Sequence, residues 1–440
     1  MLKLRYYFRL FFTFISRFQK ILFLGILIGI LSFFALEFVF PELGNSRHIG
    51  ITGRYHTETI PREILSMVSQ GLTNITDTGE TVPGIAESWE TTDDGSTWVF
   101  HLRDNLKWQD GSAITSDTIQ YSFEDVKIEV PDPKTIIFKL NAPFSPFPVV
   151  VSRPTFKKGL LGTGEWKVTS ISLSGSFVEK LVLKRGGDKQ VIRFYPSEEK
   201  TKLAFKLGQI DEAWDIIDPL PFNEWGTVKI EEATNKSRYV GIFFNTAKED
   251  GNDLSDKKLR QSLSYAIDKS SFGFERALGP ISPDSWAYNP QIKDYEYDPN
   301  HSKELLSDFS EEALSNLTIE LSTTAILLPI AERISHFWEA VGIRTNILVT
   351  PVLPETYRAF LAIYDIPEDP DQYSTWHSTQ VSTNISKYSN PRIDKLLEDG
   401  RIELDPEVRK KIYLDFQRFL LEDAPAVFLY HPASFKLIRK

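Results

Sequence analysis

Cysteine and histidine are the residues to test first for catalytic or metal-binding chemistry. The chain has no cysteine, which excludes disulfides, thiolate zinc sites, a cysteine nucleophile and a lipid-modified N-terminal cysteine. Its histidines are scattered, and no two of them have the spacing of a pair of metal ligands. They are His48, His56, His101, His301, His336, His377 and His431. We therefore expect no resident metal ion and no thiol chemistry.

Other sequence patterns of catalytic sites are missing as well. The chain contains no P-loop, no G-x-S-x-G and no H-E-x-x-H motif. The glycine-rich stretch Gly159–Gly164 is not followed by a lysine in the P-loop position, so it predicts a turn before a strand. Glu198 and Glu199 are adjacent in sequence and cannot face each other across a helix. The residues thus predict a protein that is not an enzyme and needs no cofactor.

Length and charge narrow the class of protein further. A chain of 440 residues is too long for one ordinary hydrophobic core and predicts two or more lobes. The net charge is −10, and removing the five positive charges of residues 1–20 leaves −15 for residues 21–440. Phosphate binding needs a basic surface, so this acidic body argues against nucleic acid as a partner.

The N-terminal residues predict an uncleaved membrane anchor. Residues 21–36 carry no charge, and a helix over 21–40 would be long enough to span a bilayer core. All flanking basic residues lie in segment 1–20, which we expect to stay in the cytoplasm, with 41–47 as a tether and the body extracytoplasmic. The alternative is a cleaved signal peptide, but no small-x-small cleavage site follows the apolar run.

The body has the alternating pattern of an α/β protein. Strands are predicted at Ser96–Leu102, Thr135–Leu140, Arg238–Phe244, Leu317–Ser322, Arg344–Val349 and Val427–Tyr430. Helices are predicted at Pro61–Leu72, Ser116–Phe123, Glu198–Leu207, Asp256–Ile267, Ile330–Val341, Arg392–Glu398 and Glu407–Glu422. The strand–helix–strand order over 317–349 predicts a parallel pair with a right-handed crossover.

One long motif resembles a known family. Its residues run from Gly71-Leu72 through Val82-Pro83-Gly84-Ile85-Ala86-Glu87-Ser88-Trp89, Asp93-Asp94-Gly95-Ser96-Thr97-Trp98 and Lys107-Trp108-Gln109-Asp110-Gly111. Later blocks are Gly162-Thr163-Gly164-Glu165-Trp166, Leu259-Arg260-Gln261-Ser262-Leu263-Ser264-Tyr265-Ala266-Ile267-Asp268 and Tyr388-Ser389-Asn390-Pro391. Together they resemble the family 5 extracellular solute-binding proteins, the peptide- and nickel-binding components of ABC importers, over about residues 48–438.

The resemblance implies a two-lobed periplasmic-binding-protein-like fold of type II, in its peptide-binding subclass. Lobe I would comprise 48–236 with 425–440, and lobe II 237–424. The family's extra subdomain would be trimmed, at about 73–150, because Phe123 is followed almost directly by the strand block that begins at Val130.

The resemblance also implies candidate ligand-binding residues. In peptide-binding relatives an aspartate pairs with the α-amino group of the ligand, and Asp365 is the best match, with Asp369 as the second. Trp376 and His377 follow this segment and would wall a side-chain pocket. The alternatives are that the two aspartates are solvated loop residues and that Trp376 is ordinary core.

The expected function is a membrane-anchored receptor that captures peptides in an interlobe cleft and delivers them to ABC permease subunits. A peptide would be held largely through its backbone, with loose side-chain specificity. A binder of nickel or a metal chelate is the alternative cargo, and a sensory receptor on the same scaffold is the alternative role. An extracytoplasmic hydrolase is disfavoured by the missing nucleophile and metal motifs.

Overall fold

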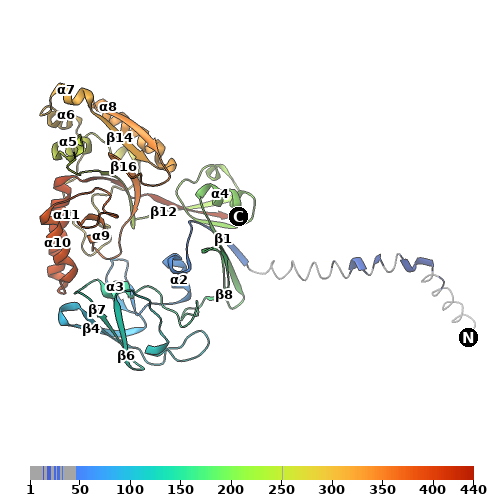
Figure 1. Ribbon diagram of the computed structural model, residues 1–440. Helices are drawn as coiled ribbons and strands as arrows, with labels where there is room; N and C mark the ends of the chain where they lie inside the picture. Colours follow the sequence, from blue (N-terminus) through green and yellow to red (C-terminus); the bar gives the residue numbers. More distant parts are fainter. Residues whose placement is uncertain are drawn as a thin grey trace, which may run out of the picture. The chain divides into compact units, whose positions relative to one another are not determined.

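The computed structural model describes residues 46–249 and 251–440, together with residues 13, 17–20, 24–25, 27–29 and 32 (Figure 1). Within this described part, no helix has the length and apolarity needed to cross a membrane. The predicted anchor at 21–40 falls mostly outside the described residues. The chain divides into two compact units, unit 1 with Met1–Arg54 and Val168–Glu212, and unit 2 with Tyr55–Lys167 and Ala213–Lys440.

Unit 1 is built on strands β1 (Ser46–Thr52), β10 (Asp188–Tyr195), β9 (Phe177–Arg185) and β8 (Lys167–Ser174), which neighbour one another in this order. β1 runs parallel to β10, and β10 runs antiparallel to β9. Helix α4 (Glu198–Lys206) packs on β1 and β10 and begins at Ser197, whose hydroxyl accepts from the Lys200 amide. The predicted helix at Glu198–Leu207 is confirmed.

The first part of unit 2 contains a four-stranded antiparallel sheet. Its order is β4 (Ala86–Thr92), β5 (Thr97–Leu102), β7 (Thr135–Leu140) and β6 (Val126–Asp132). The strands bury an aromatic cluster that includes Trp98, Phe100 and Phe138. The hairpin β2 (Thr73–Ile75) and β3 (Thr81–Pro83) and the helices α2 (Arg62–Val68) and α3 (Phe147–Val150) complete this part.

The helix predicted at Ser116–Phe123 is wrong. The structure has only a 3-10 turn at Ser116–Thr118, with Thr115 as its N-cap residue. The hydroxyl of Tyr121 donates to the Val151 carbonyl at 2.7 Å and accepts from the Leu72 amide at 3.1 Å. These tertiary hydrogen bonds hold residues 119–123 in an extended path, so local helical preference does not decide the structure there.

The second part of unit 2 is a five-stranded mixed sheet. Its order is β15 (Arg344–Val349), β14 (Thr318–Thr323), β16 (Ala359–Asp365), β13 (Arg238–Phe244) and β17 (Ala426–Tyr430). β14 and β15 are parallel and are joined by helix α8 (Leu328–Ala340), which confirms the predicted strand–helix–strand unit.

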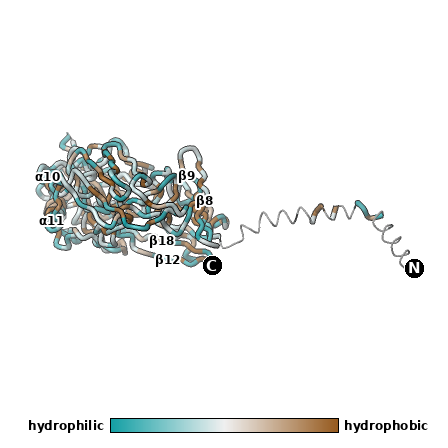
Figure 2. The backbone as a smooth tube through the Cα atoms, turned by 90° about the horizontal axis from the view of Figure 1, so that it is seen from below, coloured by the Kyte–Doolittle hydropathy of each residue, from teal (hydrophilic) through white to brown (hydrophobic). Residues whose placement is uncertain are grey.

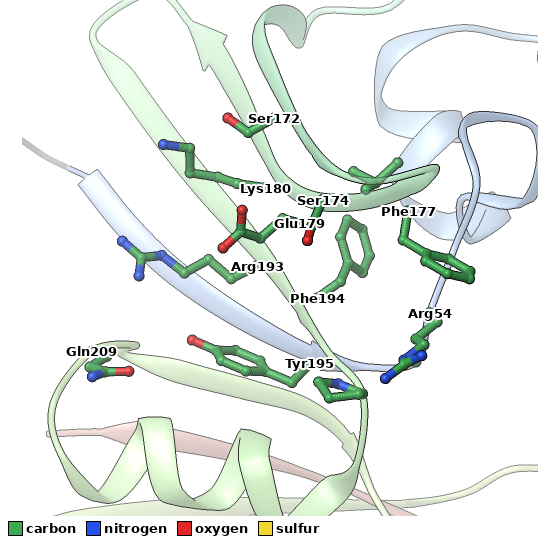
Figure 3. Close-up of a pocket in the computed structure, with 13 residues that line it drawn as sticks. Arg54, Ser172, Ser174, Phe177, Glu179, Lys180, Arg193, Phe194, Tyr195 and Gln209 are labelled. Atoms are coloured by element: carbon green, nitrogen blue, oxygen red, sulfur yellow. The ribbon is translucent and has the colours of Figure 1, made fainter.

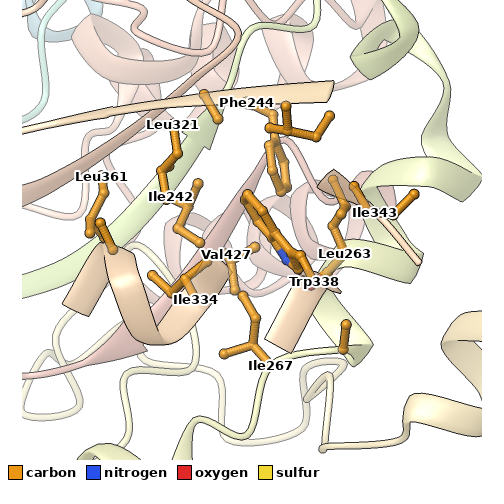
Figure 4. Packing of buried hydrophobic residues seen from close by; sticks show 14 of the residues in the cluster. Ile242, Phe244, Leu263, Ile267, Leu321, Ile334, Trp338, Ile343, Leu361 and Val427 are labelled. Atoms are coloured by element: carbon orange, nitrogen blue, oxygen red, sulfur yellow. Dashed lines mark hydrogen bonds between the residues drawn. The ribbon is translucent and has the colours of Figure 1, made fainter. Parts of the chain in front are cut away.

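Both faces of this sheet are buried. On β13, Val240 and Ile242 belong to one apolar cluster, and Tyr239 and Phe243 belong to the other. The first cluster packs against α5 (Lys257–Tyr265) and α8, with Trp338 near its centre (Figure 4). This alternation between two clusters explains why the strand reads as a continuous apolar run.

The second cluster includes residues of α10 (Pro391–Ile402) and α11 (Pro406–Asp423), which lie side by side (Figure 1). Both helices carry hydrophilic as well as hydrophobic stretches, as a helix with one buried face should (Figure 2). The shorter helices α6 (Pro299–Leu306), α7 (Glu311–Asn316) and α9 (Tyr373–Trp376) complete this part.

One predicted strand belongs to a different sheet. Val427–Tyr430 was assigned to lobe I with 48–236, but the structure pairs β17 with β13 in the five-stranded sheet. Of segment 425–440, β18 (Ala433–Arg439) lies outside the five-stranded sheet. It pairs with β12 (Val228–Thr234) and lies next to β11 (Glu212–Ile216). The apolar run of β17 is buried on both faces of the five-stranded sheet, with Val427 and Leu429 in one cluster and Ala426 and Phe428 in the other. The other lobe boundaries stay a prediction.

Candidate functional site

Unit 2 contains a polar cavity of about 720 Å³, which we call the cleft. One wall comes from α2 and from the β2–β3 hairpin, at residues 62, 66 and 74–79. The other wall comes from residue 237 and from the loops at 282, 284–285 and 366–368. The cleft therefore lies between segments that are up to about three hundred residues apart in sequence, as is typical of a binding site between structural elements.

Arg62 joins the two walls. It stands at the first position of α2, directly after Pro61, and its guanidinium forms an ion pair with Glu368 across the cleft. A second guanidinium nitrogen donates to the hydroxyl of Ser152 at 2.9 Å. Glu368 is placed by β16, because the chain leaves this strand at Asp365 and the Ile366 amide then donates to the Ser237 carbonyl at 2.8 Å.

The tip of the β2–β3 hairpin closes one end of the cleft. The Thr78 carbonyl accepts from the Trp286 amide at 2.9 Å. Gly79 has a φ of +81°, and a Cβ there would lie 3.2 Å from the Glu368 carbonyl oxygen. A side chain at this position would be both strained and crowded, so glycine permits the hairpin to approach the opposite wall.

Three carboxylates line the cleft, and they differ in their partners. Glu368 is paired with Arg62, and Asp284 lies 3.2 Å from the Nζ of Lys236. Asp77, at the exposed hairpin tip, has no ion-pair partner among residues 46–249 and 251–440. The cleft can thus offer a carboxylate to a cationic group of a ligand without first breaking an internal ion pair.

Asp365 lies one residue before the segment that lines the cleft. Its side chain is 81% exposed and accepts from Arg238 Nε at 2.6 Å, while Arg238 Nη1 donates to Asp215 at 2.7 Å. Burial opposes the charge of Arg238, but the two carboxylates outweigh it and raise its pKa above the ordinary value. Asp365 is therefore exposed, and its side chain is oriented by Arg238.

Asp369 has a different environment, inside the protein. Its two carboxylate oxygens accept from Arg409, at 2.9 Å from Nη1 and 2.5 Å from Nη2. One of them also accepts from the Asp371 amide at 2.9 Å. Arg409 further donates to the Gly400 carbonyl at 2.8 Å. Both oxygens of Asp369 are thus used in a buried bidentate ion pair that ties the loop to α11.

Trp376 and His377 do not line the cleft. Trp376 is fully buried, with its ring 6.1 Å from that of Phe243 and 6.3 Å from that of Phe428. His377 is buried, stacks on Tyr373 at 4.0 Å and has its Nδ1 2.8 Å from the Thr379 hydroxyl. Trp376 at the end of α9 and His377 directly after it therefore pack in the interior, and neither lines the cleft.

The sequence reasoning missed the residues that do line the cleft. Arg62, Asp77 and Asp284 lie in three separate segments, and none belongs to the block that led to Asp365 and Asp369. Asp77 had one usable signal, since Thr76-Asp77-Thr78-Gly79 has the composition of a hairpin turn. Within the described part of the chain, no group of three or more histidine, aspartate and glutamate side chains could hold a metal ion.

Comparison with known proteins places this chain in a family. The family model for bacterial extracellular solute-binding proteins, family 5 Middle, matches residues 80–378. A probable D,D-dipeptide-binding periplasmic protein, DdpA, of Escherichia coli is 24% identical over 79% of this chain and 78% of its own. A dipeptide-binding protein of the same organism is 23% identical over 82% of this chain and 83% of its own.

A solved structure shows the same fold. NikZ from Campylobacter jejuni, in complex with Ni(L-His), matches with a TM-score of 0.73 and 22% identity, over 90% of this chain and 94% of its own. The α/β architecture is thus that of the two-domain periplasmic binding proteins. Since the family model covers more than half of the chain, this protein belongs to the bacterial extracellular solute-binding proteins of family 5.

Proposed function

We propose that the protein captures short peptides in the cleft and delivers them to the permease of an ABC importer. Three observations support this function: the family, the names of the dipeptide-binding relatives, and a polar cleft with carboxylates on both walls. The cleft carries the most weight, because a peptide presents a cationic amine at one end and the same backbone groups whatever its sequence.

In this proposal Asp365 binds the α-amino group. Only one of its oxygens is engaged by Arg238, and the side chain remains exposed beside Ile366, which lines the cleft. Asp77, on the opposite wall, is the other carboxylate available for a cationic group. Asp369 is unsuited to this role because Arg409 already binds both of its oxygens.

Calorimetry with free-amine and N-acetylated peptides tests the amine clamp. We expect Asp365→Asn to weaken binding of free-amine di- and tripeptides at least tenfold and to leave the weak binding of acetylated peptides unchanged. Asp308→Asn is the matched control, because Asp308 is also an exposed acid in an ion pair, with Lys258, outside the cleft. The clamp is wrong if both peptide forms bind equally and neither Asp365→Asn nor Asp77→Asn changes the affinity.

A nickel–histidine chelate is the competing cargo, since the NikZ structure with the same fold contains one. The same titrations include this chelate. Saturable binding of the chelate, with no binding of any peptide, would replace the peptide proposal by the chelate one.

The proposal also covers the location of the protein in the cell. Residues 21–40 would anchor the protein, with the body outside the cytoplasm, as the uncharged run 21–36 and its basic flank suggest. N-terminal sequencing of the native protein tests this, and a start near residues 36–42 would contradict it. Genes for a permease and an ATPase beside this one would favour transport over a sensory role.

A further inference from the structure

Unit 1 has its own cavity, of about 620 Å³, which shares no lining residue with the cleft (Figure 3). Strand β8 contributes Ser172 and Ser174, β9 contributes Lys180, and β10 contributes Arg193 and Tyr195. Gln209, after α4, and Arg54, after β1, lie at its edge (Figure 3). The cavity therefore lies over strands β8, β9 and β10, beside α4.

Two cations lie side by side in the lining of this cavity. In the antiparallel pair β9–β10, Arg193 stands directly opposite Lys180. Side chains opposite each other in such a pair point to the same face, with Cβ atoms about 4.5–5.5 Å apart, and like charges there destabilise the sheet. No ion pair joins either cation to another residue in 46–249 or 251–440. Their repulsion disfavours this pairing, and an anion bound beside both cations would relieve it.

Two polar atoms in the same place lack partners. The Nε of Arg193 and the hydroxyl of Tyr195 are shielded from solvent and have no hydrogen-bond partner among the described residues. A buried donor that makes no hydrogen bond costs about 1–3 kcal/mol. A tyrosine hydroxyl is protonated at neutral pH and can donate. Burial raises the pKa of Tyr195 further, although the neighbouring Arg193 guanidinium opposes this rise.

The charge of the lining is opposite to that of the whole chain. Arg54, Lys180 and Arg193 line the cavity together with a single acid, Glu179. The guanidinium of Arg54 lies over the Phe177 ring, 5.7 Å from its centroid, which offers an apolar surface beside the charges. A lining with an excess of two positive charges stands out in a protein with a net charge of −10.

We propose that this cavity binds a small organic oxyanion, with its carboxylate or phosphate between Arg193 and Lys180. The oxyanion accepts from Arg193 Nε and from the Tyr195 hydroxyl, which gives both orphan donors a partner, and it removes the repulsion across the β9–β10 pair. The apolar part of the ligand packs toward Phe177. This site is separate from the cleft and takes a ligand of opposite charge to the amine that the cleft would bind.

Calorimetry on the full chain at constant ionic strength tests the site, with inorganic phosphate and succinate as the two probes. We expect saturable binding of at least one probe, and the probe that binds shows whether the site takes phosphate or carboxylate. The double variant Lys180→Gln/Arg193→Gln should weaken that binding at least tenfold and leave peptide affinity unchanged.

A matched control lies four residue pairs along the same ladder. Lys184 and Lys189 are also opposite each other on β9 and β10, and they do not line the cavity. Lys184→Gln/Lys189→Gln removes the same charge and should keep probe affinity within twofold. Equal losses in the two double variants would show that general charge and not a site is responsible, and this would overturn the proposal, as would the absence of saturable binding.

A second measurement needs no variant. Phenylglyoxal modifies accessible arginines, and the bound probe should slow modification of Arg193 at least threefold, while exposed Arg185 of the same strand pair reacts at its ordinary rate. Equal protection of both arginines, or protection of neither, would contradict an anion seated in the cavity.

Discussion

The two ends of segment 365–369 carry the same residue type in opposite environments. Asp365 is 81% exposed in its side chain and shares Arg238 with Asp215. Asp369 is 10% exposed in its side chain and has Arg409 to itself, in a bidentate pair. A buried charge is tolerated only with a well-oriented partner, whereas an exposed one remains solvated. Burial, not residue type, therefore separates a structural carboxylate from one that is available to a ligand.

The largest expected effect is at the buried end. Asp369→Asn leaves the Arg409 guanidinium buried beside a neutral side chain, and breaking a buried pair in this way costs ~3–5 kcal/mol. Urea unfolding followed by circular dichroism measures the loss. Asp415→Asn, which removes an exposed acid 2.8 Å from Arg418, is the control and should change the free energy of unfolding little. A loss below ~1 kcal/mol for Asp369→Asn would contradict this contrast, because the buried Asp369–Arg409 ion pair would then contribute no more than an exposed ion pair.

A smaller effect is expected at Glu368, which lies between the two ends. Its side chain is half-exposed, and its partner Arg62 is held by Ser152 as well. A partly exposed ion pair contributes about 0.2–1 kcal/mol. A double-mutant cycle of Arg62→Gln and Glu368→Gln measures the coupling. A coupling near zero would mean that the pair does not hold the walls of the cleft together.

Asp365→Asn should change stability least of the three acidic positions. Arg238 keeps its hydrogen bond to Asp215, so no charge is left without a partner. We expect a change in the free energy of unfolding below ~0.5 kcal/mol, the lower part of the range for exposed pairs. Asp365→Asn should thus lower peptide affinity with little loss of stability. A loss of stability as large as that of Asp369→Asn would show that Asp365 is structural too.

The smallest expected effect is a pH dependence of the stability, which arises from His431 next to Arg238. His431 is buried, and its Nδ1 lies 2.7 Å from the Arg238 carbonyl oxygen. Burial lowers the pKa of His431, and the charge of Lys236 lowers it further. The hydrogen bond to the Arg238 carbonyl and the charges of Glu275 and Asp284 oppose this decrease. The unfolded chain therefore binds the proton more readily, and stability is lost as pH falls below about 6.5, the unperturbed value for histidine.

His431→Gln should flatten this dependence. Urea unfolding of the native protein and of the variant at pH 7.5 and pH 5.5 measures the difference, and the variant should lose less stability on acidification. An identical loss in the two proteins would assign the dependence to other groups.

Much of the fold was predictable because its elements bury one face in a regular pattern. The helix at Lys257–Tyr265 was found through Leu259 and Leu263, which both lie in the core. Strand β16 was missed, because Ala359–Asp365 is buried on both faces and lacks the alternation of an exposed strand.

The candidate site was less predictable, because its residues meet only in three dimensions. Asp369 could not be recognised as structural from its own segment, since its partner Arg409 lies 40 residues later, on α11. The same applies to Arg62 and Glu368, which are 306 residues apart. The resemblance to the family pointed to this segment, but it gave no information on which of its acids is buried.

Two short connections in unit 2 carry a mechanical consequence. The chain passes from β12 to β13 through residues 235–237, and back from β17 to β18 through 431–432. The Asn235 amide donates to the Pro432 carbonyl at 2.9 Å, so the two connections are tied together. Two connections tied in this way can bend together. They resist sliding past each other, because sliding would break the strand pairing on both sides of the connections. We therefore expect any motion between the five-stranded sheet and the β12–β18 pair to be a rotation at these connections and not a translation.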